Sequence, residues 1–234
     1  MISIIIPVLN EEDIICRLLN YITRNFSSKH ILEIVVVDGG STDHTRALVE
    51  KFISTGHRKI KLLKTEKGRA RQMNFGAKTA SGSVLYFLHA DSFPPHDFDS
   101  LIMNEIDQGN EAGCFRMQFD SSHWWLKLAG WFTQFNWRAC RGGDQSLFIS
   151  RTLFNRIGGY QEHYTIYEDQ VLIKALYSRN QFVVINKKLR TSARMYRKHG
   201  IWKLQLLYWS IYVKRWFGAD AGALYNFYRK RIIQ

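Results

Sequence analysis

The chain has 234 residues, of which 46% are hydrophobic and 14% are aromatic. This length and apolar content are typical of one folded domain with a small appendage, and they exclude overall disorder. Lysine and arginine number 33 against 20 aspartate and glutamate residues, which gives a formal net charge of +13. An excess of this size favours phosphate, nucleic acid or an anionic membrane surface as the partner.

The cysteines and the apolar stretches indicate where the protein works. The cysteines stand far apart and form no CxxC pattern: Cys16, Cys114 and Cys140. We therefore expect a reducing cytoplasm rather than a disulfide framework or a zinc knuckle. The N-terminal apolar run lacks a basic leader and is cut by Pro7, so it is a poor signal peptide. Polar residues interrupt the apolar stretches 124–139 and 201–217. Neither stretch reaches the ~20 consecutive apolar residues that a membrane-spanning helix needs.

Strand and helix patterns alternate along the first half of the chain. Short apolar, β-branched runs predict strands at 3–8, 33–37, 59–63 and 83–88. Segments with one apolar face predict helices at 14–22, 42–52 and 69–79. The helix at 14–22 is preceded by Asn10 as a predicted N-cap. A βαβ series of this kind predicts a mostly parallel sheet with helices on both faces.

The pattern changes beyond residue 110, where strands and helices no longer alternate regularly. Strands are predicted at 113–119, 145–150 and 182–185, and helices at 124–139, 168–178 and 201–217. This half predicts a mixed sheet continuous with the first, because no repeat or linker separates the two. We expect one domain over 1–199, with a nucleotide-binding half over 1–110 and an acceptor half over 111–199. A basic, aromatic helical extension is expected over 200–234.

Polar residues directly follow three of the first four predicted strands: Asn10-Glu11, Asp38-Gly39-Gly40 and His89-Ala90-Asp91. Right-handed crossovers bring the carboxyl ends of these strands to one edge, where open α/β sheets bind ligands. The first of these loops has no GxGxxG, and GxxxxGK[ST] is absent from the sequence. A dinucleotide-binding or P-loop interpretation loses its main support.

Two of these strand ends carry acids, which do not bind phosphate directly. Asp38 could accept a hydrogen bond from the edge of a nucleotide base, or it could cap the next helix. Asp91 could hold a divalent cation between two phosphate oxygens, or it could cap the bend before Pro94.

A third group stands in GRARQMN, at the start of the helix predicted over 69–79. It offers planar donors and amides: Arg69, Arg71, Gln72 and Asn74. These could contact an anionic ligand, or they could form a solvated basic face.

Four segments, IIIPVLNEE, VVVDGGSTD, FLHAD and the later GGY…YED, resemble in order and spacing the inverting nucleotide-sugar glycosyltransferases of family 2, which have the GT-A fold. The resemblance runs over about 2–177. It implies an α/β fold with a mostly parallel central sheet, and transfer of a hexose-type sugar from a UDP- or GDP-sugar to a hydroxyl acceptor with inversion. A narrower likeness, carried by GRARQMN, HAD, GGDQ and TSARMYRKHG, is to a bacterial subgroup associated with arsenosugar biosynthesis.

The resemblance also implies roles for single residues. The nucleotide pocket would include Asp38 on the base edge, Glu11 on the ribose, and further lining from Pro7, Asn10, Gly39, Gly40 and Ala90. Asp91 would be the metal-holding acid of the DxD motif, binding Mg²⁺ or Mn²⁺. His89 stands where that motif has its first aspartate. One carboxylate helped by a histidine binds Mg²⁺ or Mn²⁺ more weakly than two carboxylates do. Asp169 would be the general base, and the neighbouring Glu168 its less favoured alternative.

The remaining implied contacts lie further along the chain. In GGDQ, Gly143, Asp144 and Gln145 lie where family members contact the donor sugar or the acceptor; the alternative is an ordinary turn. Arg194 and Arg197 could stabilise the departing diphosphate. The tryptophans between Cys114 and Gly143 could stack on an acceptor or simply belong to the core.

The charge excess is concentrated at the C-terminal end. Residues 182–234 contain twelve lysines and arginines and one acid, Asp220, whereas 1–181 contain 21 basic and 19 acidic residues. The segment 201–217 is apolar around most of its circumference and needs a cover. That cover could be the domain itself, a second copy in a homodimer, or the plane of an anionic membrane. We expect no nucleic-acid partner, because no module pattern appears and the first 181 residues are nearly neutral.

Two alternatives to an active transferase stand. A catalytically degenerate GT-A-like binding domain or membrane-associated scaffold would explain His89 and the aromatic, basic C-terminus. A sugar nucleotidylyltransferase would want a glycine-rich, basic phosphate loop after the first strand, where this chain has Asn10-Glu11-Glu12.

Overall fold

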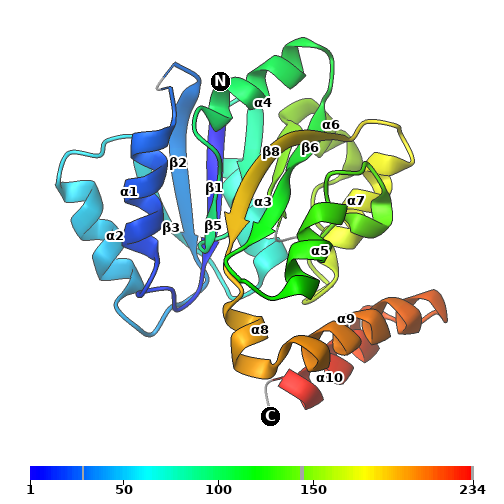
Figure 1. Ribbon diagram of the computed structural model, residues 1–234. Helices are drawn as coiled ribbons and strands as arrows, with labels where there is room; N and C mark the ends of the chain where they lie inside the picture. Colours follow the sequence, from blue (N-terminus) through cyan, green and yellow to red (C-terminus); the bar gives the residue numbers. More distant parts are fainter. Residues whose placement is uncertain (28, 143–144, 233–234) are drawn as a thin grey trace.

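The computed structural model describes residues 1–27, 29–142 and 145–232. One eight-stranded sheet lies between helices on both of its faces, and three C-terminal helices form a further layer beside the sheet edge (Figure 1). The strands are β1 (Ile2–Val8), β2 (Ile31–Asp38), β3 (Ile60–Lys64), β4 (Val84–Phe87), β5 (Ser92–Phe93), β6 (Ala112–Phe119), β7 (Leu147–Ser150) and β8 (Val183–Thr191). The helices are α1 (Ile15–Asn25), α2 (Thr45–Ser54), α3 (Arg69–Thr79), α4 (Phe98–Asp107), α5 (Trp124–Phe132), α6 (Arg151–Ile157), α7 (Glu168–Tyr177), α8 (Arg194–His199), α9 (Ile201–Trp216) and α10 (Ala221–Ile232).

The strand order is β3-β2-β1-β4-β7-β6-β8-β5. The first four strands are parallel neighbours, as the alternation of strands and helices predicts. Strand β7 runs antiparallel to both β4 and β6, while β8 is parallel to β6. The prediction of a parallel first half joined to a mixed second half is therefore confirmed, and the carboxyl ends of β1, β2 and β4 share one edge.

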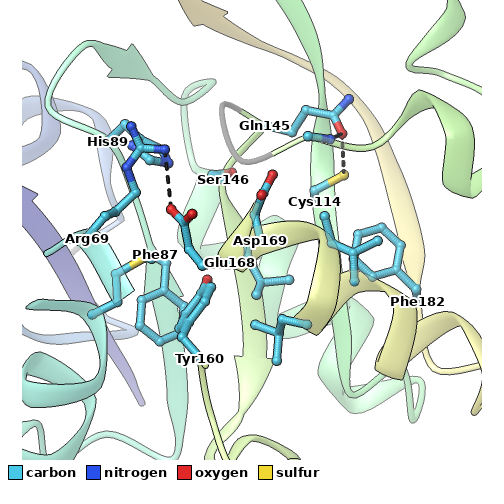
Figure 2. A pocket seen from close by; sticks show the side chains of 15 residues that line it. Arg69, Phe87, His89, Cys114, Gln145, Ser146, Tyr160, Glu168, Asp169 and Phe182 are labelled. Atoms are coloured by element: carbon cyan, nitrogen blue, oxygen red, sulfur yellow. Dashed lines mark hydrogen bonds and ion pairs between the residues drawn. The ribbon is translucent and has the colours of Figure 1, made fainter. Parts of the chain in front are cut away.

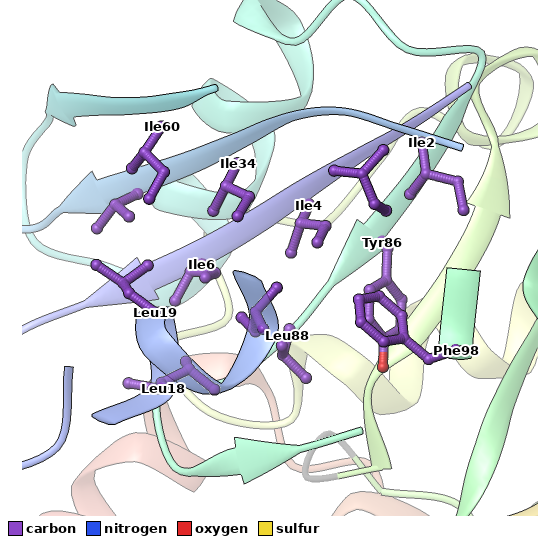
Figure 3. Close-up of a cluster of buried hydrophobic side chains, with 14 of the residues drawn as sticks. Ile2, Ile4, Ile6, Leu18, Leu19, Ile34, Ile60, Tyr86, Leu88 and Phe98 are labelled. Atoms are coloured by element: carbon purple, nitrogen blue, oxygen red, sulfur yellow. The ribbon is translucent and has the colours of Figure 1, made fainter. Parts of the chain in front are cut away.

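Strand β1 is buried on both faces, which explains its continuous apolar sequence. Ile2, Ile4 and Ile6 point to the face covered by α1, where Leu18 and Leu19 pack against them (Figure 3). The intervening Ile5 points to the opposite face, beneath α3. A Cβ on Gly76 of α3 would lie 2.6 Å from Cγ2 of Ile5, so α3 can approach the sheet this closely because that position is glycine.

The predicted N-cap Asn10 was wrong, because Ile14 holds that position of α1 and Asn10 bonds to the loop after β2. The two largest boundary errors lie in the second half of the chain. The helix predicted over 124–139 ends at Phe132, because Thr133 turns the chain: its hydroxyl donates to the Gly130 carbonyl and accepts from the Met117 backbone N–H. A short 3₁₀ turn follows at Arg138–Cys140. The strand predicted over 182–185 continues to Thr191, because β8 pairs with β6 along that length.

The three C-terminal helices pack on one another, on the loop before α7, and, through Tyr196 and Ile201, on β6 and α5. Leu204, Leu207 and Ile211 of α9 are buried together with Leu224 of α10 and Tyr164 of that loop. Gly200, with φ of +83°, separates α8 from α9. The division into a domain over 1–199 and an extension over 200–234 stays a prediction. Within the described residues, each helix is too short or too polar to cross a bilayer.

Candidate functional site

The loops after β1 and β2 are tied to each other at the sheet edge. Asn10, in the left-handed region with φ of +55°, accepts from the Thr42 backbone N–H at 2.8 Å and donates its own N–H to Ser41 Oγ at 2.9 Å. The Glu11 N–H donates to Thr45 Oγ1 at 2.8 Å. Pro7 lies within β1 beside Val37 of β2. The two predicted nucleotide loops are therefore held as one surface.

Asp38 shapes the loop that follows it. Its fully buried carboxylate accepts from the N–H groups of Gly40 at 3.2 Å and Ser41 at 3.1 Å. The N-cap position of α2 belongs to His44, so the helix-capping alternative is wrong. Asp38 instead closes the Gly39-Gly40 turn, and its contact with a nucleotide base stays a prediction.

Gln72 and Asn74 connect parts of the site to one another through their side-chain amides. The buried Gln72 amide donates both of its hydrogens at 2.8 Å, to the carbonyls of Val8 and Val37, where β1 and β2 end. A Cβ on Gly39 would lie 2.8 Å from that amide. Asn74 donates to the Tyr160 carbonyl and to Glu162, and it accepts from the Tyr160 N–H. The amide hydrogens of Gln72 and the whole Asn74 amide are thus engaged within the protein, and a contact of either residue with a nucleotide stays a prediction.

The two arginines of GRARQMN have separate environments. Arg69 Nη1 lies 3.6 Å from Glu168 Oε1, on the wall of a cavity at the sheet edge. Arg71 lies outside that cavity and pairs with Glu66 and, at 3.5 Å, with Glu162. The structure therefore brings Arg69 into the candidate site and leaves Arg71 on the surface.

This cavity joins residues that are distant in the sequence (Figure 2). It encloses about 460 Å³ including its opening to solvent, between the end of β4, the start of α3 and the start of α7. Its polar lining includes Arg69, His89, Gln145, Glu168 and Asp169, all of which the sequence singled out. Apolar side chains complete it: Met73, Phe87, Leu147, Leu172, Ile173 and Phe182. A concave site with a few convergent polar groups is typical of small-ligand binding.

The acids of the cavity stand in the first turn of α7, where carboxylates complement the helix dipole. The preceding Tyr167 has φ of +74°, a conformation that bulky residues rarely adopt and that turns the chain into this helix. Glu168 is buried and faces Arg69, whereas Asp169 lies on the cavity wall (Figure 2). The nearby Tyr160 has a pKa raised well above its usual value, first by burial and then by the charges of Asp169 and Glu168, although Arg69 opposes the shift. Tyr160 therefore stays a neutral hydrogen-bond donor beside the acids.

A buried polar group lies on the opposite side of the cavity. Gln145 is 2% exposed, and its Oε1 accepts from the Gly142 N–H at 3.3 Å. Its Nε2 has no hydrogen-bond partner among the described residues, so it is suited to donate to a ligand oxygen. The neighbouring predictions, Gly143 and Asp144, lie outside the described residues.

Sequence reasoning missed Arg141, which supports this side of the cavity. The buried guanidinium donates to the carbonyls of Thr133 at 2.6 Å and Phe135 at 2.7 Å, and to Cys114 Sγ at 3.2 Å. Burial raises the pKa of the Cys114 thiol despite the opposing charge of Arg141, so the sulfur is held as a thiol. An arginine in a loop gives no sequence signal that it will be buried on carbonyl groups.

Arg194 joins the C-terminal helices to the nucleotide loops. Its two terminal nitrogens each lie 2.6 Å from a carboxylate oxygen of Glu11, and its Nε lies 3.3 Å from Asp91. The other predicted diphosphate ligand, Arg197, pairs with Asp120 at 3.1 Å. The structure thus places Arg194 between the predicted ribose acid and the predicted metal acid, and Arg197 beside it on a different carboxylate.

The residues that could hold a metal are few. Among residues 1–27, 29–142 and 145–232, no three or more His, Cys, Asp or Glu side chains are grouped as metal ligands. Asp91 is partly exposed and His89 lines the cavity. A single carboxylate can hold a hard cation such as Mg²⁺ that takes its other ligands from water and substrate phosphates, but an imidazole is not a ligand that such a cation prefers.

The sequence can also be compared with those of known proteins. The family model described as glycosyl transferase family 2 matches residues 3–175. A PGL/p-HBAD biosynthesis glycosyltransferase of Mycobacterium tuberculosis is 32% identical over an alignment 181 residues long, which covers 72% of this chain and 66% of the relative. Glycosyltransferase AglE of Haloferax volcanii is 36% identical over 95 residues, which are 40% of this chain and 31% of AglE.

Solved structures share the fold at lower identity. The mannosyltransferase PcManGT of Pyrobaculum calidifontis, in complex with GDP-Man and Mn²⁺, has a TM-score of 0.71 at 18% identity and covers 94% of this chain and 65% of its own. Staphylococcus aureus TarS 1–349 in complex with UDP-GlcNAc has a TM-score of 0.68 at 22% identity and covers 82% of this chain and 58% of its own. The chain thus spans less than two thirds of these relatives. With the strand-end loops and the cavity at one sheet edge, the family match shows that the chain belongs to glycosyl transferase family 2, a family of nucleotide-sugar glycosyltransferases, and has the GT-A fold.

Proposed function

We propose that this protein transfers a sugar from a nucleoside-diphosphate sugar to a hydroxyl acceptor with inversion, with Asp169 as the general base. The observation that carries the proposal is the single cavity that joins Asp169, at the start of α7, to His89, at the end of β4 (Figure 2). A single displacement at a sugar carbon needs a general base on one side of the sugar, here Asp169. It also needs a group beside the leaving diphosphate on the other side, here His89.

The donor side of the proposal rests on the nucleotide loops. Glu11 would contact the ribose and Asp38 the base, with Asn10, Pro7, Gly39, Gly40 and Ala90 completing the pocket. The solved relatives bind UDP-GlcNAc in one case and GDP-Man with Mn²⁺ in another, which supports a UDP- or GDP-sugar as donor.

The acceptor side rests on the environment of the two acids. Asp169 would take the proton of the acceptor hydroxyl as its oxygen attacks the anomeric carbon from the face opposite the diphosphate. Glu168 is the weaker candidate for this role, because it is buried and paired with Arg69. The Nε2 of Gln145, which has no hydrogen-bond partner among the described residues, would donate to a sugar hydroxyl across the cavity.

The diphosphate side involves Arg194, Asp91 and His89. Arg194 would leave the carboxylates of Glu11 and Asp91 and pair with the diphosphate as negative charge develops there. Bound at Asp91 and His89, Mg²⁺ or Mn²⁺ would neutralise part of that charge. A guanidinium already placed at this point supports charge stabilisation by this chain itself.

Two measurements test the proposal. Thermal-shift titration with UDP, GDP, UDP-glucose and GDP-mannose, each with and without Mn²⁺, should raise the melting temperature for at least one nucleotide. Asp169→Asn should abolish sugar transfer from that donor and leave the nucleotide shift intact. The matched control is Asp107→Asn, at the exposed end of α4, which should keep full turnover. Absence of a shift with every nucleotide, or full turnover by Asp169→Asn, contradicts the proposal.

A second candidate function is a catalytically degenerate GT-A-like binding domain or scaffold. The pairing of Asp91 with Arg194 favours it, because this cation already compensates the predicted metal acid. If Asp91→Ala leaves metal-dependent nucleotide binding unchanged and no donor supports turnover, the results favour the degenerate binding domain over the transferase. The arsenosugar subgroup and the cytoplasmic location, free or at the inner face of a membrane, stay predictions.

A further inference from the structure

Helix α9 has two apolar faces, and its own fold covers one of them. Leu204, Leu207 and Ile211 are buried against α10 and the loop before α7. The opposite face carries a second stripe at spacings of three and four residues, all exposed: Trp202, Leu206, Trp209, Val213 and Trp216. Leu206 is 57% exposed and Trp216 is 85% exposed. Packing on the domain, which was one of the covers expected for 201–217, therefore accounts for only half of this helix.

Helix α5 extends the stripe with residues from a distant part of the sequence. The Trp124 ring lies 6.0 Å from that of Trp202, and Trp125 lies 5.4 Å from Trp202 and 5.9 Å from Trp209. One α5 face exposes Trp124 and, two turns on, Trp131. We call these exposed side chains the aromatic surface: Trp124, Trp131, Trp202, Leu206, Trp209, Val213 and Trp216. Helices α5 and α9 lie next to each other at the lower right of the molecule (Figure 1).

The charges around the aromatic surface are almost all positive. Residues 121–142 contain Lys127, Arg138 and Arg141 and no acid, and residues 194–232 contain nine lysines and arginines against Asp220. Lys127 and Lys203 are exposed beside the tryptophans. A second copy of the chain placed on this surface would bring like charges together. An anionic lipid surface instead complements both the charge and the tryptophan content.

We infer that the aromatic surface is a membrane-docking site, with α9 lying in the headgroup plane of an anionic bilayer. Sixteen residues make α9 about 24 Å long. An interfacial helix buries its apolar face roughly 5–10 Å deep while lysines contact anionic lipid headgroups. The described helices do not span a bilayer, so this attachment is peripheral. None of the residues of the aromatic surface lines the cavity, so docking leaves the candidate site open.

Vesicle co-sedimentation tests this directly. The full chain is mixed with vesicles of phosphatidylcholine alone or of phosphatidylcholine and phosphatidylglycerol at 3:1. We expect strong partition to the anionic vesicles, weakened by salt and by removal of phosphatidylglycerol. The triple variant Leu206→Gln, Val213→Gln and Trp216→Gln should lose at least about tenfold in partition. Lys127→Gln with Lys203→Gln should reduce the preference for anionic lipid.

The controls separate docking from folding and from catalysis. Leu32→Gln, an exposed leucine on β2, should partition like the parent chain. The triple variant should keep its nucleotide thermal shift, so loss of docking and failure of the proposed function are distinguishable. If the triple variant does not fold, quenching of the parent chain's tryptophan emission by brominated lipid decides the matter. No partition of the parent chain, equal partition of the triple variant, unquenched emission, or a dimer that the triple variant breaks without vesicle binding would overturn the inference.

Discussion

The strand-end loops of β1 and β2 and the two arginines of α8 are held in place by different means. The loops are fixed by buried hydrogen bonds, above all those of the Gln72 amide to the ends of both strands. The side chains of Arg194 and Arg197 are instead held by ion pairs whose guanidinium groups are half-exposed, Arg194 with Glu11 and Asp91, and Arg197 with Asp120. Buried bonds are costly to break, whereas exposed ion pairs contribute little to stability. The nucleotide side is therefore built to stay as it is, and the arginine side can rearrange.

Gln72→Leu tests the buried hydrogen bonds of the strand-end loops and should have the largest effect on the free energy of unfolding. It removes two buried hydrogen bonds at the junction of β1 and β2, which should lower the free energy of unfolding by roughly 2–3 kcal/mol. Urea unfolding followed by circular dichroism measures this. The matched control is Gln108→Leu, at an exposed helix end, which should change stability by less than about 0.5 kcal/mol. Equal effects of the two variants would show that the Gln72 bridge does not hold the loops.

Glu33→Gln extends the comparison to a second set of buried hydrogen bonds, at the amino ends of β1 and β2, and tests it through pH. Burial disfavours the charged form of Glu33, but hydrogen bonds from Lys61, Ser81 and Ser3 outweigh it, so the pKa lies below its usual value. A lowered pKa contributes stability that is present at neutral pH and is lost as the pH falls through it. We expect Glu33→Gln to cost about 1–2 kcal/mol at pH 7 and progressively less below pH ~4.5. Unfolding curves of both chains between pH 3 and 7 measure this, and a pH-independent difference would contradict it.

Arg194→Gln tests the exposed ion pairs of α8 and should have the smallest effect on the free energy of unfolding. Removing an exposed ion pair should change the free energy of unfolding by less than about 1 kcal/mol. The variant should nevertheless bind nucleoside diphosphate about tenfold more weakly, because Glu11 and Asp91 then repel the phosphates without a guanidinium between them. Isothermal titration with UDP and GDP measures this.

The control for Arg194→Gln is Arg179→Gln, an exposed arginine just after α7 whose guanidinium donates to the Ala175 carbonyl of that helix. It should leave both stability and nucleotide affinity unchanged. If Arg194→Gln lowered stability as much as Gln72→Leu, the contrast between the two regions would be wrong.

Much of the fold could be predicted because its signals are local. The β-branched run in 33–37 and the apolar face of 14–22 each follow from one short stretch of sequence. Of the polar cavity lining, only His89 is predicted as a polar residue after a buried strand. Arg69 is predicted at a helix start, and the roles of Gln145, Glu168 and Asp169 come from the family resemblance. Strand β5, with two residues, and α8, with six, are too short to give a periodic signal.

The rest depends on contacts between distant residues. Gln72 lies 64 residues from Val8, and Arg194 lies 183 residues from Glu11. No spacing in the sequence distinguishes an amide that binds a ligand from one that bridges two strand ends, since both suit the same residue type. The outward stripe of α9 was likewise hidden, because a broadly apolar helix looks the same in sequence whether one face or both are buried.

The contact of Arg194 with Glu11 and Asp91 bears on which molecules compete for the site. On the proposed function, a ligand that draws this arginine away must replace two carboxylates as its partner. A nucleoside has no anionic group to offer and a monophosphate has one phosphoryl group, whereas a diphosphate can accept from both ends of the guanidinium fork. We therefore expect the released nucleoside diphosphate to be the strongest product inhibitor, which would make turnover depend on other enzymes that remove it.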